Sequence, residues 1–443
     1  MTALPVRSLT LCAFAAATLA LAAVGQDPLQ QRVEALEAQN RELAARLAAL
    51  QAESASHAAG FEALAQDLER LQLGDVLPAL GESRYGLGPA ASKVYGVQQG
   101  LSIGGYGEFL YEDRQGAADR LDALRAILYV GYKFDDRWVL NTEIEIEHGS
   151  TSKSSGTTSD GGDVSFEFGY LDYLASDAWN VRGGMVLIPV GFVNELHEPI
   201  TFLGAQRPEV EKRIMPTTWR APGAGAFGGV GGFSYRAYAV TALEGSRFDE
   251  DGLRAGRQKG NRTAADDFAL TGRLDWTDTP GLIVGASVYW GDTGQDGIDA
   301  DGRPVPDLNT TIVDLHVDWK SGPLWLRGLW ATAWIDDTAR RNAAASGATV
   351  ASRMDGFYVE GGYDVMSFLA PDSGHALYPF VRYEEVDTQA RIAPGSTRVA
   401  GKSDSIVTVG LHWRPIPQVV VKADFQDFDS GQDRFDLLLG YVF

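Results

Sequence analysis

The sequence predicts an all-β fold, a 16-stranded antiparallel transmembrane β-barrel preceded by an N-terminal coiled-coil helix. Three features lead to this prediction: an aromatic-rich C-terminal strand, many segments in which apolar and charged residues alternate, and a heptad repeat near the N-terminus. Successive side chains of a strand point to opposite faces, so such alternation gives one apolar and one polar face. An apolar outer face and a polar inner face are typical of an outer-membrane barrel.

The first 25 residues have the pattern of a secretory signal peptide. Residues 9–24 form an Ala-rich apolar stretch, and cleavage is expected after Ala22 or Gly25. The one cysteine, Cys12, lies in this stretch, so the exported chain has no disulfide and no thiolate ligand. The rest of the sequence has no apolar run of about 18 residues, so a membrane-spanning form must be a closed barrel.

Residues 29–72 keep a heptad register, which predicts a coiled coil in the periplasm. A coiled coil needs partner chains and therefore favours an oligomer; the alternative is a helix that packs on its own barrel. Residues 73–99, rich in Gly and Pro, are expected to be a linker. The a and d positions of the heptads are, in order, Val33, Leu36, Asn40, Leu43, Leu47, Leu50, Ser54, His57, Phe61, Leu64, Leu68 and Leu71.

Residues 100–443 are predicted to form the barrel. In most of the expected strands one face is aliphatic or aromatic and the other carries charges, and short turns alternate with long polar loops. The last strand is expected to pair with the first and close the barrel. The sixteen expected strands are 101–111, 124–134, 138–148, 164–173, 179–188, 224–232, 234–243, 267–276, 282–290, 311–319, 323–334, 356–364, 377–386, 405–414, 418–427 and 435–443.

The connection 189–223 differs from the other loops because it mixes large apolar residues with charged ones. A solvated loop would not carry so many apolar side chains, so we expect it to fold into the barrel and narrow the lumen. The alternative is an outer loop that makes contacts within a trimer.

Charged side chains at such a narrow point act as a filter in channels. Basic and acidic groups on opposed walls would produce a transverse field, whereas the alternative is structural pairing of Arg with Glu. The expected constriction and lumen residues are Glu195, His197, Glu198, Arg207, Glu209, Glu211, Arg213 and Arg220 in the loop, and Arg125, Arg182, Arg236, Glu143, Glu145 and Glu147 on strands.

Composition and motif spacing argue against other functions. The net charge of −21 argues against a nucleic-acid partner. The six His residues are scattered and show no metal-site spacing, and neither His148 nor His412 has a convincing Ser partner. We therefore expect no enzyme activity, no metal and no cofactor.

Five short motifs stand out in the sequence: Gly104–Glu108, Leu128–Phe134, Thr142–His148, Arg207–Glu209 and Pro216–Arg220. Together they resemble the porin O/P family of bacterial outer-membrane channels, named for phosphate-selective members. The resemblance implies a trimeric 16-stranded barrel with an inward constriction loop and often an N-terminal coiled coil. It also implies that the barrel-assembly machinery recognises the C-terminal Phe443. The acidic strand at 143–147 is a poor match for an anion path.

The sequence thus predicts an outer-membrane porin, a homotrimer in contact with outer-membrane lipid. It would pass small hydrophilic solutes or ions by diffusion, and a preference for anions or phosphate is left open. The alternative function is a structural tether, in which the coiled coil at 29–72 contacts the cell wall.

Overall fold

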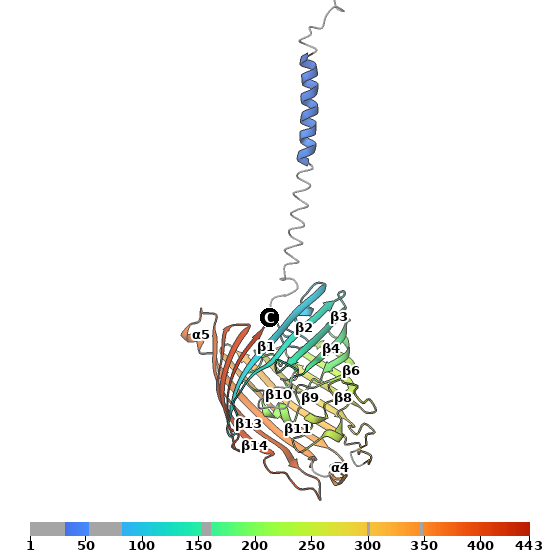
Figure 1. Ribbon diagram of the computed structural model, residues 1–443, viewed down its shortest axis with the longest axis vertical. Coiled ribbons are helices and arrows are strands. Elements are labelled where there is room, and N and C mark those ends of the chain that lie inside the picture. The colour runs from blue at the N-terminus through green and yellow to red at the C-terminus, as the bar shows by residue number, and fades with distance from the viewer. Residues whose placement is uncertain (1–31, 53–81, 152–160, 299–301, 345–348) are drawn as a thin grey trace, which may run out of the picture. The chain divides into compact units, whose positions relative to one another are not determined.

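The computed structural model describes two units of the chain, residues 1–72 and 73–443, which are treated separately. In the first unit, residues 32–52 form one α-helix (Figure 1). The apolar heptad side chains Val33, Leu36 and Leu43 of this helix are exposed in the single chain. The described residues are 32–52, 82–151, 161–298, 302–344 and 349–443.

The predicted signal peptide, 1–25, and the second half of the heptad repeat, 53–72, lie outside the described residues. Within the described ranges, no helix is long and apolar enough to cross a membrane. The coiled coil at 29–72 therefore stays a prediction, of which the helix at 32–52 is the described part.

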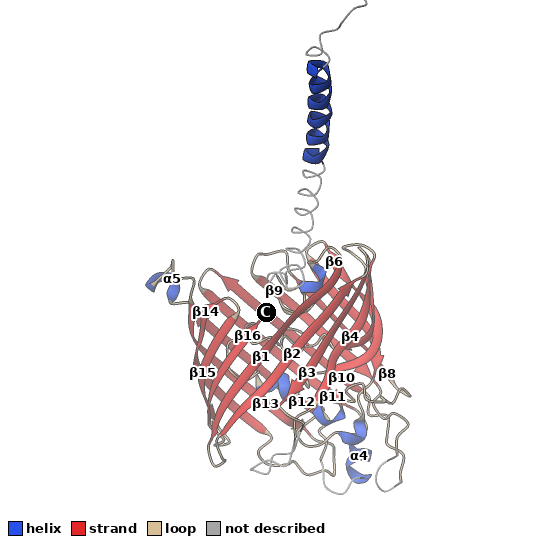
Figure 2. Cartoon of the chain, turned by 45° about the horizontal axis from the view of Figure 1, so that its top comes forward, coloured by secondary structure: helices blue, strands red, loops and turns tan. Residues whose placement is uncertain are grey.

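The second unit is a closed antiparallel barrel of sixteen strands (Figure 2). Every predicted strand is present, and the largest boundary differences are a few residues. The strands are β1 (Gly100–Arg114), β2 (Arg120–Lys133), β3 (Trp138–Glu147), β4 (Val164–Leu174), β5 (Asn180–Leu187), β6 (Arg220–Val230), β7 (Phe233–Thr241), β8 (Phe268–Trp276), β9 (Leu282–Gly291), β10 (Thr310–Ser321), β11 (Leu324–Ile335), β12 (Arg353–Tyr363), β13 (Ala376–Arg391), β14 (Ser403–Ile416), β15 (Val419–Phe428) and β16 (Arg434–Val442).

The last strand closes the barrel as the alternation predicts. β16 pairs with β1 from Tyr106 opposite Val442 to Arg114 opposite Arg434. Along β16, Leu437 and Leu439 are exposed while Asp436 is fully buried. The apolar face of this strand therefore points outward and its polar face points into the lumen.

The two rims of the barrel differ in loop length. At the short-turn rim, strands are joined by tight turns such as that between β2 and β3, where the Asp135 carboxylate accepts the N–H groups of Arg137 and Trp138. The exception on this rim is 364–375, which carries the short helix α5. The opposite, long-loop rim bears most of the long connections. The short helices of the barrel unit are η1 (Lys93–Tyr95), α3 (Glu209–Arg213), η2 (Gly245–Arg247), η3 (Arg254–Gly256), α4 (Thr338–Ala344) and α5 (Met366–Leu369).

The segment expected to be a linker, 73–99, is described from residue 82, and from there it does not behave as a linker. Leu87, Val94 and Tyr95 are buried against the inner faces of β1 to β4. The many Gly and Pro residues suggested a solvated connector, but the apolar side chains between them pack inside the barrel. Gly131 on β2 permits this contact, because a Cβ there would lie 2.5 Å from the Val94 side chain.

An apolar core fills part of the lumen on the side of the long loops. Phe192, Ile214 and Trp219 of the β5–β6 connection pack with Phe248 and Leu253 of the β7–β8 connection. In this packing the apolar side chains of the β5–β6 connection lie inside the barrel. The connection spans 188–219 rather than the predicted 189–223, because residues 220–223 already belong to β6.

Candidate functional site

The inward loop, residues 188–219, is closed at its base by one amide side chain. Asn194 Nδ2 donates to the carbonyls of Ile188 (2.7 Å) and Trp219 (2.8 Å), and its Oδ1 accepts the Trp219 N–H (2.6 Å). The two ends of the loop are thus joined through a fully buried residue. A compact loop with adjacent ends presents a fixed surface to the lumen.

A carboxylate organises the interior of this loop. Glu211 Oε2 accepts the N–H groups of Phe192 (2.8 Å) and Val193 (2.7 Å), and Tyr358 on β12 donates to Glu211 Oε1 (2.7 Å). Glu211 is fully buried. It therefore serves as an internal brace that links two parts of the loop to the wall, and it does not line a solvent path.

The far wall of the barrel holds the middle of the loop. Lys422 on β15 donates from Nζ to the carbonyls of Phe202 (2.9 Å) and Gly204 (2.8 Å). Arg327 on β11 donates to the Thr201 carbonyl (2.9 Å). These contacts stretch the loop from β5 across the lumen, which is the placement expected of a constriction.

Two basic cavities lie beside the loop. The larger, of about 520 Å³, opens at the long-loop rim, and the smaller, of about 90 Å³, lies deeper. Arg254 of η3 borders both. The larger cavity is lined by basic residues Arg220, Arg247, Arg254, Arg257 and Lys259, and the smaller by Arg125, Arg207, Lys212 and Arg254.

Three of these arginines carry positive charge without a paired carboxylate. Arg207, Arg254 and Arg257 have no acidic group within ion-pair distance among the residues that the structure describes. Partial desolvation and the neighbouring Arg207 lower the pKa of Arg254 to about 10, and desolvation and Arg254 lower the pKa of Arg257 to about 9. Mutual repulsion of this kind marks a region of positive potential.

The acidic strand does not form the opposite wall of these cavities. Glu143 and Glu145 on β3, with Glu167 on β4, are buried beneath the loop. Glu145 lies 3.7 Å from Arg125, and Glu167 pairs with Arg220 at 2.7 Å. These buried carboxylates therefore do not form an acidic wall that faces a basic one, as the expected transverse field requires. Glu145 and Glu167 lie instead against Arg125 and Arg220.

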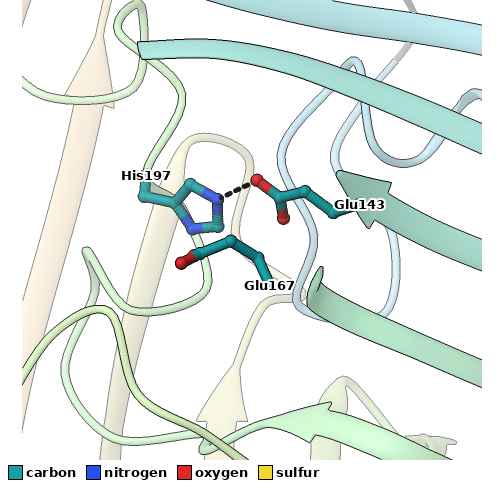
Figure 3. Close-up of side chains that lie close together, drawn as sticks. All are labelled: Glu143, Glu167 and His197. Carbon is teal, nitrogen blue, oxygen red and sulfur yellow. Dashed lines mark hydrogen bonds and ion pairs between the residues drawn. The ribbon is translucent and has the colours of Figure 1, made fainter. Parts of the chain in front are cut away.

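Figure 3 shows how the loop meets this acidic cluster. His197, from the loop, points Nε2 of its ring at the Glu143 carboxylate, and the Glu167 carboxylate lies beside the ring. His197 Nε2 lies 3.1 Å from Glu143 Oε1, and its Nδ1 lies 3.0 Å from the Asn194 carbonyl. The cluster thus joins the loop to two neighbouring strands.

Most other predicted lumen residues are held in ion pairs or hydrogen bonds. Glu198 accepts the N–H groups of Ala90 and Ala91, and Glu147 is partly buried near the end of β3. These side chains are therefore engaged with other parts of the barrel and do not project freely into the lumen. The remaining pairs are Arg182 with Asp172, Arg236 with Glu195 and Asp275, Glu209 with Lys212, Arg213 and Arg434, and Arg125 with Glu108.

Sequence reasoning missed the basic residues of the β7–β8 connection. Arg254, Arg257 and Lys259 follow one another closely in a segment that was expected to be an ordinary polar outer loop. The concentration of basic residues at 254–262 was a usable signal in an otherwise acidic chain. These basic residues line the cavities because η3 turns Arg254 back toward the lumen, and no local sequence pattern predicts that turn.

Comparison with known proteins gives one clear relative in sequence. No family model matches the chain. An uncharacterized protein of Aquifex aeolicus (strain VF5) is 36% identical over 379 residues, which make up 82% of this chain and 84% of that protein.

Solved structures share the architecture at low identity. OmpF of Salmonella typhi, in complex with daunomycin, is similar with a TM-score of 0.52 at 14% identity, over 78% of this chain and 98% of that one. The outer membrane channel DcaP of Acinetobacter baumannii has a TM-score of 0.46 at 12% identity, over 77% of this chain and 97% of that one. The likeness to OmpF shows a common 16-stranded barrel fold.

Proposed function

We propose, from the barrel itself, that the protein is an outer-membrane porin. The chain belongs to the same family as the uncharacterized protein of Aquifex aeolicus, but the name of that relative states no activity. Small hydrophilic solutes would diffuse through the barrel passively, with a preference for anions. The observation that carries the preference is the pair of basic cavities that meet at Arg254 beside the inward loop.

The charge balance of the cavities supports an anion path. Arg207 and Arg254 present guanidinium groups that pair with no carboxylate among the described residues. Each cavity has one acidic lining residue, Asp163 in the larger and Glu108 in the smaller, and Glu108 is paired with Arg125 at 2.9 Å. Selectivity in channels follows the groups that face the path, not the net charge of the chain. The acidic strand therefore no longer argues against anions.

Phosphate is the finer proposal. Guanidinium groups bind phosphate and carboxylate oxygens in pairs of hydrogen bonds, so small oxyanions suit a cavity lined by several arginines. The resemblance to the porin O/P family points the same way. Conduction requires weak binding at several successive sites, and Arg257, Arg254 and Arg207 would supply such a series.

We also propose the cellular setting. Residues 1–25 direct export, the barrel lies in outer-membrane lipid, and Phe443 is the handle for the barrel-assembly machinery. The chain forms a homotrimer, and the exposed leucines of the helix at 32–52 pack against the same helix of other copies in the periplasm. Among the described residues, no contact favours the alternative function, a tether to the cell wall.

Reversal potential in a salt gradient across a planar bilayer tests the proposal. We expect the wild type to favour anions, and the double substitution Arg207→Glu and Arg254→Glu to move the reversal potential toward cations. Arg340→Glu is the matched control, because Arg340 is an exposed residue of α4 paired with Asp337 and borders neither cavity.

Two results would contradict the proposal. A wild-type protein that inserts into bilayers without stable conductance would exclude the porin function. A double variant with the same reversal potential as Arg340→Glu would show that ions do not pass the arginines.

A further inference from the structure

Three ligating side chains from three separate elements meet inside the barrel. Glu143 from β3, Glu167 from β4 and His197 from the inward loop place one ligand atom each within 4.8 Å of the others (Figure 3). All three residues are at least 98% buried. No spacing rule predicts that these three residues meet, because they are far apart in the chain.

The carboxylates have oxygens that nothing satisfies. Glu143 Oε2 and Glu167 Oε2 are buried and have no hydrogen-bond donor among the described residues. Glu145 Oε1 also lacks a hydrogen bond there, although Arg125 lies 3.7 Å from it. A buried acceptor without a partner costs about 1–3 kcal/mol, and more when it is charged. Several such oxygens side by side call for a cation or protons between them.

The histidine is oriented as metal-binding histidines are. His197 Nδ1 lies 3.0 Å from the Asn194 carbonyl, an acceptor, so Nδ1 carries the hydrogen. In the neutral ring this leaves the lone pair on Nε2, which points at Glu143. A backbone carbonyl that fixes the tautomer in this way is a common outer-shell contact of metal sites.

One of the three ligand-to-ligand distances is already that of a small bound cation, and the others lie within 4.8 Å. With metal–ligand bonds of about 2.0–2.1 Å, neighbouring ligands of a tetrahedral ion lie about 3.3 Å apart. The distance from His197 Nε2 to Glu143 Oε1 is 3.1 Å. One imidazole and two carboxylates, with a position left for a further ligand, form a donor set suited to zinc and related transition metals.

We propose that Glu143, Glu167 and His197 bind one divalent transition-metal ion, which joins the inward loop to the barrel wall. The ion would neutralise the unsatisfied oxygens and fix His197 against β3 and β4. This site replaces the expectation that the chain binds no metal. It does not depend on the channel function, because it rests on the buried cluster alone.

The competing arrangement is an ion pair between a protonated His197 and Glu143, without a metal. Only the metal site contains a bound ion, so measuring the metal content distinguishes the two arrangements without measuring conductance. Full-length protein is extracted in detergent, stripped with EDTA, exposed to ZnCl2, passed through gel filtration and analysed for zinc. We expect one zinc per chain for the wild type and a raised unfolding temperature relative to the stripped protein.

Variants assign the site. His197→Ala and Glu143→Gln are expected to lose the retained zinc and the temperature shift. His375→Ala is the matched control, since His375 is exposed in the 364–375 turn and should retain both. His197→Ala leaves buried carboxylates unpaired and can therefore prevent folding. Visible absorption of Co²⁺ bound to the wild type provides a second readout that needs no variant.

Three outcomes overturn the proposal. If wild-type protein that was stripped with EDTA and then exposed to ZnCl2 retains no zinc after gel filtration, the ion pair without a metal is the correct arrangement. Equal zinc content in Glu143→Gln, His197→Ala and wild type would place the metal elsewhere. Co²⁺ absorption typical of six oxygen ligands would exclude the imidazole from the site.

Discussion

Single charged residues inside the barrel act mainly as joints between elements. Glu198 of the inward loop is fully enclosed and accepts the N–H groups of Ala90 (2.9 Å) and Ala91 (3.0 Å) through Oε1. One carboxylate thereby attaches the N-terminal segment to the loop. Burial, opposed by these two hydrogen bonds, raises the pKa of Glu198 to about 7.

This shift predicts a pH dependence of stability. The folded protein binds the Glu198 proton more tightly than the unfolded chain, whose pKa is near 4.5. The contribution of Glu198 to the free energy of unfolding is therefore fully present below about pH 4.5. It is lost as the pH rises through about 7, and the total loss is at most about 3 kcal/mol. Glu198→Gln keeps the Oε1 acceptor and should remove this decline.

Thermal unfolding across this pH range checks the prediction. Glu82→Gln is the control, because Glu82 is exposed, and it should keep the wild-type profile. An unchanged decline in Glu198→Gln would assign it to another group.

At the scale of elements, the inward loop behaves as a closed unit rather than a flexible insertion. Its ends meet at Asn194, its interior at Glu211, and its middle at Lys422 on the far wall. The N-terminal segment at 84–95 packs beneath it through Glu198. Loop and segment together therefore set the shape of the lumen, and the barrel wall alone does not.

Asn194→Ala should release the base of this loop. It removes the acceptor of the buried Trp219 N–H, at a cost of about 1–3 kcal/mol, while the Ile188 and Trp219 carbonyls keep the backbone N–H groups of Val190 and Ile188 as donors. We expect a lower unfolding temperature together with altered single-channel conductance.

Asn342→Ala is the matched control for this variant. Asn342 makes a similar set of contacts, with both the N–H and the carbonyl of Val350, but in the connection after β11. It should lower stability without the same change in conductance. If both variants change conductance equally, the inward loop has no special role.

At the scale of the whole molecule, closure by β16 on β1 leaves the barrel without a free edge. The outward residues of β16, such as Leu437 and Leu439, are exposed in the isolated chain. In a bilayer they would meet lipid, which explains why the most apolar face of the protein is on its surface.

Leu439→Arg tests this orientation. A basic side chain on the lipid face near the bilayer midplane costs about 2–4 kcal/mol. Urea titration in lipid vesicles should show a loss of that order, whereas Leu439→Phe should remain close to wild type. A tolerated arginine would mean that Leu439 does not face the hydrocarbon core.

The sequence by itself determined the barrel. Alternation with a period of two is a local property, so the sixteen strands, their faces and the closing pair could be located without any knowledge of contacts. The same reasoning predicts the inward loop, because Phe192, Ile214 and Trp219 are too apolar for a solvated connection. These features follow from the transfer of apolar surface out of water, which each segment signals separately.

Tertiary structure alone decided which charges meet. His197 and Glu143 are 54 residues apart, and Arg220 and Glu167 are 53 apart, so no spacing rule links them. Burial of the 84–95 segment and the turn of Arg254 toward the lumen likewise depend on strands closing into a ring around them. The alternating sequence pattern determines which face of the strand each side chain occupies. Closure of the barrel determines which other side chains it contacts on that face.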